Sequence, residues 1–378
     1  MDRILIPSPT RRDLLNLADP RLHARFDLVF EEQPGIDGVF GSSDSTAALA
    51  VVVADRLGLP GPGYDAFMRC HDKLVCRRIC RRAVPEVTPA FAPVDAHRRW
   101  DEPPLPYPFF LKPVQGHLSQ HAYRIDSASD LDHALGAARA AGFRNLIAEE
   151  LLTGPLVTFE GFIAGGQVTP VGVTDAVLHP NEISFMRFEY PSVFPAGLQD
   201  AMAGIAHRLM PALGFDGSLF NIEFFVQPDG SLRIVEVNGR MASQFAPLVR
   251  AVHGVSTYEL GMELAAGGRP TLPPRRPGVV AASVLIRYWE DGIVRGLPDP
   301  MPLLERFPGV QIELLVRHGQ RLSENDDDTA SHRLAVIALS GASRRELVTR
   351  AAEAAQMLEF EIETTAQKPA EHQGSRSP

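Results

Sequence analysis

The apolar residues of this chain fall into short runs that alternate with amphipathic stretches, the pattern of a mixed α/β protein. Residues 3–7 and 26–30 predict strands, and residues 37–62 predict a strand, a loop and a helix that ends at GLPGP. Asp44 or Ser45 can cap that helix. The start of the chain is therefore expected to form a small α/β unit.

A helical pattern covers residues 65–83, and four of its arginines fall on one face. Such a face is typical of a solvated basic surface; its members are Arg77, Arg78, Arg81 and Arg82. Residues 85–108 are rich in proline and predict a linker or an extended crossover. Further on, a hairpin should turn at Gly165–Gly166, and a second proline-rich boundary lies at 269–278. Other helices are expected at residues 128–141, 197–213, 256–266 and 343–357.

Composition narrows the classes of function. The chain has 37 basic and 46 acidic residues, a formal net charge of −9, which argues against non-specific nucleic-acid binding. Its longest apolar run, residues 47–54, is too short to cross a membrane, and the first residues show no signal-peptide pattern. Three cysteines without a CxxC pair argue against a disulfide scaffold or a structural zinc site. We expect a cytoplasmic protein that binds neither nucleic acid nor membranes.

Lysine is rare in this chain, since only Lys73, Lys112 and Lys368 occur among the 37 basic residues. Arginine is a wide planar fork and lysine a compact point charge, so the two are not interchangeable in a tight site. Lys368 lies in a polar terminal stretch. Lys73 and Lys112 are therefore candidates for positions where an arginine would not serve.

The stretch FNIEFFVQPDGSLRIVEVN predicts a β-hairpin with its turn at PDG. Centring the turn on DG places Glu223 opposite Glu236, and Asn221 opposite Asn238, on the same face. The other face carries the pairs expected in the core, which are Ile222 with Val237 and Phe224 with Val235.

Two carboxylates that lie opposite each other, with Cβ atoms about 5 Å apart, repel unless something neutralises them. Glu223 and Glu236 can share a proton or hold a cation, and two exposed glutamates on a solvated face are the simpler alternative. Asn238 adds a neutral oxygen beside them. Two carboxylates with an amide oxygen are hard ligands that suit Mg²⁺ or Mn²⁺, so we favour the cation site.

Three motifs precede this hairpin in order: HDK at residues 71–73, FLKP at 110–113 and AEELL at 148–152. Together with EFF…EVNGR they resemble the ATP-grasp superfamily, in particular its carboxylate–amine (L-amino-acid) ligases. The resemblance implies an α/β (α+β) ATP-grasp fold between a Rossmann-like pre-ATP-grasp domain and a C-terminal α/β domain. With a disordered tail, the expected boundaries are 1–90, 91–275 (two lobes hinged near 149–152), 276–365 and 366–378.

The resemblance also implies a nucleotide site. Lys73 resembles the first ATP lysine, and Lys112 resembles the second, which contacts the phosphates. The loop that covers the phosphates is poorer in glycine than is usual for the superfamily, but it retains Ser119 as a donor. The hinge that would hold adenine comprises Glu149, Glu150 and Leu152.

Further roles follow for the hairpin and its surroundings. Arg240 resembles the arginine that stabilises the transferred phosphoryl group or the acyl phosphate. Leu156 stands where several relatives have a ribose-binding glutamate, and Glu160 is either its substitute or a surface residue. The Mg²⁺ ligands implied by the resemblance are Glu223, Glu236 and Asn238.

These residues predict an ATP-dependent ligase that joins a small carboxylate to an amine through an acyl phosphate. The resemblance implies that both substrates are amino-acid-like. Two alternatives stay open, a carboxylase of the biotin carboxylase type and a nucleotide-binding protein without chemistry. A homodimer is a further expectation from the resemblance. Pocket-lining candidates are Phe185, Met186, Arg187, His253 and Arg287.

Overall fold

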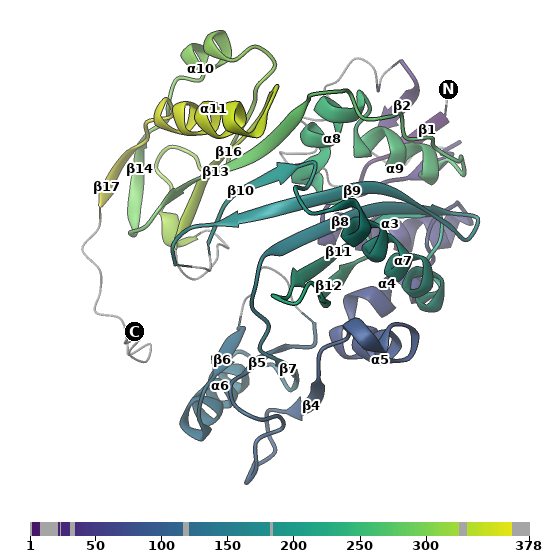
Figure 1. Ribbon diagram of the computed structural model, residues 1–378, viewed down its shortest axis with the longest axis vertical. Coiled ribbons are helices and arrows are strands. Elements are labelled where there is room, and N and C mark those ends of the chain that lie inside the picture. The colour runs from purple at the N-terminus through teal and green to yellow at the C-terminus, as the bar shows by residue number, and fades with distance from the viewer. Residues whose placement is uncertain are drawn as a thin grey trace.

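The computed structural model describes residues 2–7, 22, 24–30, 35–115, 121–181, 184–324 and 331–364 (Figure 1). Ser119 and the stretch 366–378 lie outside these residues, so the predictions for them stay predictions. Within the described ranges, no helix is both long and apolar enough to cross a membrane.

The N-terminal unit is a parallel three-stranded sheet with a helix beside it. Strand β1 (Asp2–Leu5) lies between β2 (Phe26–Val29) and β3 (Gly38–Val39). Helix α3 (Asp44–Leu57) follows, and its cap is Ser43, whose hydroxyl accepts the backbone N–H of Thr46. The prediction of Asp44 or Ser45 as the cap is therefore wrong by one or two residues, because Asp44 already has helical geometry.

The single helix expected over residues 65–83 is two helices, α4 (Tyr64–His71) and α5 (Lys73–Ala83). Asp72 separates them with extended backbone, and its side chain accepts the N–H of Val75 as the cap of α5. An aspartate at a helix start is favourable, whereas the periodic apolar pattern continues unbroken across the joint. This is why periodicity alone missed the break.

A small lobe follows, drawn at the bottom of Figure 1. Its four-stranded antiparallel sheet has the order β4 (Phe91–Asp95), β7 (Asn145–Glu150), β5 (Phe109–Pro113) and β6 (Tyr123–Ile125), and α6 (Ala128–Ala140) packs on it. β4 lies inside the stretch predicted to be a linker. The chain enters and leaves the lobe at one place, since Ala90 and Glu150 exchange hydrogen bonds there.

The large sheet has eight strands, and their order is β12-β11-β8-β9-β10-β13-β16-β15. Their bounds are β8 (Leu156–Ala164), β9 (Gln167–Leu178), β10 (Phe185–Tyr190), β11 (Ser218–Val226), β12 (Leu232–Asn238), β13 (Val280–Tyr288), β15 (Gln311–Leu314) and β16 (His332–Gly341). A short separate pair is formed by β14 (Gly292–Gly296) and β17 (Glu361–Thr364).

Helices cover both faces of this sheet. On one face, α7 (Ala196–Leu213) and α5 bury a core that includes Phe159, Phe220 and Ile222. Towards the C-terminal end, the same sheet is covered by α10 (Met301–Arg306) and α11 (Arg344–Gln356). Strand β10 and its neighbours pack against α8 (Ala246–His253), and α9 (Thr257–Ala265) packs against β11 and β3.

The large sheet runs without interruption from β12 to β15 across the boundary expected near residue 275. Strand β10 pairs with β13, which joins the central part of the chain to its C-terminal part by backbone hydrogen bonds. The domain boundaries drawn from the sequence stay a prediction.

Candidate active site

The hairpin of β11 and β12 carries the carboxylate pair. Glu223 pairs with Glu236 and Asn221 pairs with Asn238, as the centred turn predicts. Beyond Glu223 the register shifts at a bulge, so Phe224 lies opposite Ile234, and the predicted partner Val235 is wrong. The bulge adds one residue to β12 between the carboxylate pair and the turn.

A cleft of about 560 Å³ opens above this pair. Strand β8 contributes Leu156 and Thr158, which share the carboxylate face because they lie opposite Phe225 and Glu223. Lys73, Asp44 and Arg240 also line the cleft. The cleft therefore brings residues from α3, α5, β8 and the β11–β12 hairpin to one place.

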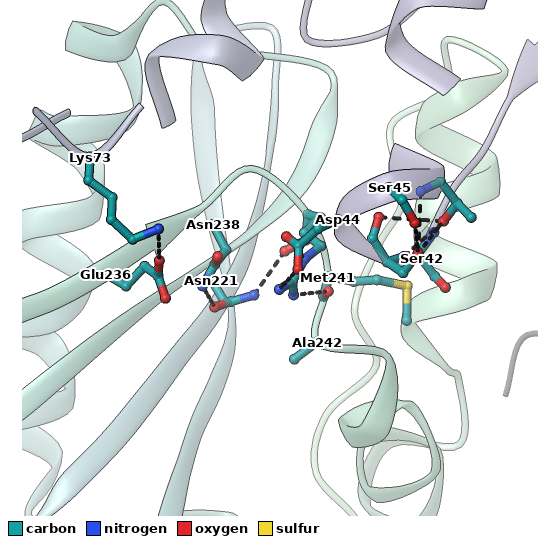
Figure 2. Close-up of polar contacts among 12 residues, drawn as sticks. Ser42, Asp44, Ser45, Lys73, Asn221, Glu236, Asn238, Met241 and Ala242 are labelled. Carbon is teal, nitrogen blue, oxygen red and sulfur yellow. Dashed lines mark hydrogen bonds and ion pairs between the residues drawn. The ribbon is translucent and has the colours of Figure 1, made fainter. Parts of the chain in front are cut away.

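The carboxylate of Glu223 is only partly neutralised by its surroundings. Burial, and then the neighbouring Glu236, raise the pKa of Glu223 above its ordinary value, and Arg240 and Lys112 oppose them only in part. The ammonium of Lys73 lies 3.2 Å from one carboxylate oxygen of Glu236, and Figure 2 marks this ion pair with a dashed line. A cation at this position would relieve the remaining repulsion.

The amides beside the pair are ordered by hydrogen bonds. Asn238 donates through its side-chain nitrogen to the amide oxygen of Asn221, at 3.0 Å, so its own oxygen remains an acceptor. Asn221 donates in turn to the carbonyl oxygen of Arg240, also at 3.0 Å (Figure 2). Within the described part of the chain, no three His, Cys, Asp or Glu side chains gather as a metal cluster. A cation here would need water or phosphate oxygens besides Glu223, Glu236 and Asn238.

Lys112 lies in a charged triad at the junction of the two lobes. Its ammonium is 2.6 Å from one oxygen of Glu149, and the guanidinium of Arg77 donates to the other oxygen at 2.5 Å. Although burial opposes it, Arg77 and then Lys112 hold the pKa of Glu149 down at about 2. Both carboxylate oxygens of Glu149 therefore have partners in the triad, and the residue could contact adenine only through its backbone groups.

Arg77 was expected on a solvated basic face, and this prediction is wrong. The residue is 3% exposed, and it also donates to the carbonyl oxygen of Val235 at 2.6 Å. Arg78, next along the same helix, is exposed as expected. The sequence alone does not show which arginines of a helix face are buried, because this depends on the positions of β7 and β12, which carry the partners of Arg77.

Arg240 is held by a residue that the sequence analysis treated only as a helix cap. Its Nε and Nη2 donate to the two carboxylate oxygens of Asp44, at 2.5 and 2.8 Å, and its Nη1 donates to the carbonyl oxygen of Met241 (Figure 2). Asp44 is the first residue of α3, almost two hundred residues away in the chain. The polar residues 42–45 (SSDS) at the start of this helix were the available signal in the sequence.

Glu160 lies on β8 opposite Asn221, on the cleft side of the large sheet. It is 2% exposed, so the surface alternative is wrong, and it accepts the backbone N–H of Ala242 at 2.7 Å. Burial raises the pKa of Glu160 to about 7, against this hydrogen bond and the charge of Arg240. Its assignment to ribose stays a prediction.

The remaining residues of the predicted hinge are Glu150 and Leu152, where β7 continues into the segment that leads to β8. Glu150 ends β7 with an exposed side chain that accepts the N–H of Ala90, and Leu152 is half-buried in the connection to β8. Of the candidate pocket residues, Phe185 lines the cleft. His253 is buried and does not line the cleft; its ring forms hydrogen bonds with the hydroxyl of Tyr190 and the carbonyl oxygen of Pro273.

Three other pocket candidates have different surroundings. Arg187 forms an ion pair with Glu189 at 2.5 Å, and its neighbour Met186 is half-buried beside that pair. Arg287 donates to the carbonyl oxygen of Phe185 and to Ser331. None of the three is among the residues that line the described cleft.

Two sequence relatives are enzymes of one kind. A D-alanine–D-alanine ligase from Desulfovibrio desulfuricans is 27% identical over 234 residues, which cover 57% of this chain and 69% of that protein. Another from Arthrobacter is 28% identical over 284 residues, which cover 68% of this chain and 69% of that protein. No family model matches the sequence.

Solved structures share the architecture over nearly the whole chain. An L-amino acid ligase from Bacillus licheniformis matches with a TM-score of 0.77 and 17% identity, covering 96% of this chain and 99% of its own. An N5-carboxyaminoimidazole ribonucleotide synthetase from Thermus thermophilus matches with a TM-score of 0.70 and 18% identity, covering 98% and 100%. These matches confirm the fold class expected from the motifs.

Proposed function

Because this chain belongs to the ATP-grasp superfamily, we propose that it is an ATP-dependent carboxylate–amine ligase that forms an amide through an acyl phosphate. The observation that supports this most is the cleft in which Glu223, Glu236 and Asn238 meet Arg240. Phosphoryl transfer to a carboxylate requires oxygen ligands for a cation, and an arginine and a lysine that stabilise negative charge.

The nucleotide site uses both lobes. Lys73 and Lys112 would contact the phosphates of ATP, and the backbone between Glu149 and Leu152 would read adenine. Glu223, Glu236 and Asn238 fit Mg²⁺ or Mn²⁺ by the chemistry of their oxygens, and by the burial and then the repulsion from Glu236 that raise the pKa of Glu223. When bound, the cation supplies positive charge between these carboxylates and the nucleotide phosphates.

The protein's own residues then stabilise charge. The substrate carboxylate attacks the γ-phosphorus, the bond to the β-phosphate oxygen breaks, and ADP leaves. Lys112 and Arg240 stabilise the negative charge that spreads over the transferred group. The amine next attacks the acyl carbon, loses a proton and expels phosphate. The acyl phosphate already activates this carbon, so no protein nucleophile is required.

The cleft also bears on the choice of substrates. Beyond the carboxylate pair its wall carries five apolar side chains, beside the charged residues Glu313 and Arg333; the apolar ones are Phe185, Phe188, Phe245, Leu285 and Leu315. An amino-acid-like substrate whose carboxylate lies at Arg240 would place its side chain against this wall. We therefore favour substrates with large apolar side chains. The homodimer remains an expectation from the resemblance.

The decisive experiment measures ADP and phosphate release from ATP and Mg²⁺ with pools of amino acids and small carboxylates. Release that requires one acid and one amine, with an amide found by mass spectrometry, would establish ligation. Glu236→Gln should abolish it while the melting temperature stays within a few degrees, because the isostere removes one anionic ligand. Release that depends on bicarbonate instead would favour the carboxylase, and full activity of Glu236→Gln would defeat the metal assignment.

A further inference from the structure

Arg77 is a buried cation for which the reaction steps above have no use. Its side chain is 4% exposed, so it cannot contact a nucleotide that occupies the cleft. Its hydrogen bonds nevertheless reach both lobes, to Glu149 on β7 and to the carbonyl oxygen of Val235 on β12. Val235 directly precedes Glu236, so Arg77 lies behind the carboxylate pair.

The charges of the triad show what Arg77 adds. Lys112 lies 2.6 Å from Glu149, and as an isolated pair the two would have no net charge. A lysine neutralised in this way attracts phosphate weakly, because the nearby carboxylate repels the same anion. With Arg77 on the second oxygen of Glu149, the triad has a net charge of +1, and Lys112 has the most exposed side chain of the three.

The second effect is on geometry. Arg77 and Lys112 each take one oxygen of Glu149, so the carboxylate is fixed from both sides in a nearly dry site. Lys112 is anchored to a fixed point rather than to a mobile side chain. The hydrogen bond from Arg77 to Val235, the residue before Glu236, places the triad beside the proposed metal ligands.

We propose that Arg77 is a positioning residue for phosphate binding, which compensates the charge of Glu149 so that the ammonium of Lys112 stays available to the phosphates of ATP. This inference rests on the proposed function for the identity of the nucleotide. It does not rest on the ligation step, since it concerns binding alone.

The test is a double-substitution cycle read by calorimetry with Mg²⁺ and a non-hydrolysable ATP analogue. Arg77→Met should weaken binding about tenfold or more, because the triad loses its positive charge. Arg77→Met combined with Glu149→Gln should regain most of that affinity, since Lys112 then has no carboxylate to neutralise it. The double variant also removes the uncompensated buried charge of Glu149, so we expect it to be more stable than Arg77→Met.

Two controls separate charge from structure. Arg78→Met, an exposed neighbour on the same helix, should leave affinity unchanged. Adenosine lacks phosphates, so its dissociation constant should be the same for wild type, Arg77→Met and the double variant. The proposal is overturned if Arg77→Met keeps its affinity, if adenosine binding falls in parallel, or if the double variant is no tighter than Arg77→Met. Wild type that binds no ATP analogue would overturn the proposed function as well, whereas binding without ligation would overturn that function alone.

Discussion

The two lysines singled out by their rarity lie at the site, each against a glutamate. Lys73 contacts Glu236, and Lys112 contacts Glu149, with side chains that are 16% and 14% exposed. Both positions are narrow and close to a carboxylate. A compact ammonium fits there, whereas a planar guanidinium would need a wider space and a fixed orientation.

Lys112→Arg is the sharpest test of this interpretation. The charge is retained, but the guanidinium would displace Arg77 or Glu149 and would not reach the phosphates in the same geometry. We expect turnover to fall about a hundredfold, with the fold intact by circular dichroism. Steady-state ADP release measures this, and activity near that of wild type would show that charge alone is sufficient.

Glu160 predicts a pH dependence of stability. Its pKa in the folded protein is about 7, above the ordinary value of 4.5, so the folded state holds the proton more tightly than the unfolded state does. The contribution of Glu160 to the free energy of unfolding is therefore fully present below pH 4.5 and is lost as pH rises through 7. The loss should approach about 3 kcal/mol by pH 8. Glu160→Gln keeps an acceptor for the N–H of Ala242 and cannot ionise.

Urea unfolding of wild type and Glu160→Gln at pH 5 and pH 8 measures this effect. The variant should lose less stability than wild type between the two values. A parallel change in both proteins would mean that Glu160 is not the group responsible.

At the scale of elements, helix α3 reaches the proposed active site through its first residue. Asp44 accepts from two nitrogens of Arg240, so the N-terminal unit orients a side chain at the end of β12. A bidentate carboxylate fixes the plane of a guanidinium more tightly than a single acceptor does. The position of the arginine therefore depends on two elements far apart in the sequence.

Asp44→Asn should lower turnover about tenfold, because the amide offers one acceptor where two are needed and its nitrogen opposes a second donor. Affinity for the ATP analogue should stay within about twofold, since binding does not need the arginine's orientation. Asp65→Asn, an exposed aspartate in the first turn of α4, is the matched control. Unchanged turnover of Asp44→Asn would show that the carbonyl oxygen of Met241 is sufficient to orient Arg240.

Elements and motifs were predictable where the signal is local. The β11–β12 hairpin pairs as its turn dictates up to Glu223, and the order of the motifs led to the fold class that the solved structures share. The bulge was not predictable, because a one-residue register shift has no marker in an apolar strand. Arg77 and Asp44 were missed for a different reason: each acquires its role from a partner on another element.

At the scale of the whole molecule, the cleft follows the large sheet past the carboxylate pair. Residues from β12 through β15 line it, and β10 lies four strand spacings, about 19 Å, from β12. The proposed phosphate chemistry is thus at one end of the cleft, and the apolar residues on β10 lie towards the other end.

Phe185→Ala tests this division. Phe185 is half-buried in the wall and packs on Phe188 with ring centroids 4.8 Å apart. The KM for a substrate with a large apolar side chain should rise about tenfold, whereas that for a small analogue should change little. Kinetics with such a pair of substrates measures the difference, and equal effects on both would place the side chain elsewhere.

The chain connects the small lobe to the rest of the protein by two crossings that lie side by side. The chain enters at β4 and leaves at β7, and these strands are neighbours, with Phe91 paired to Glu149. A lobe joined by two adjacent crossings moves most easily by rotation about a line through that pair. Arg77 stands beside this line and bonds to both sides of it, so opening and closing would turn the lobe around the triad rather than pull the triad apart.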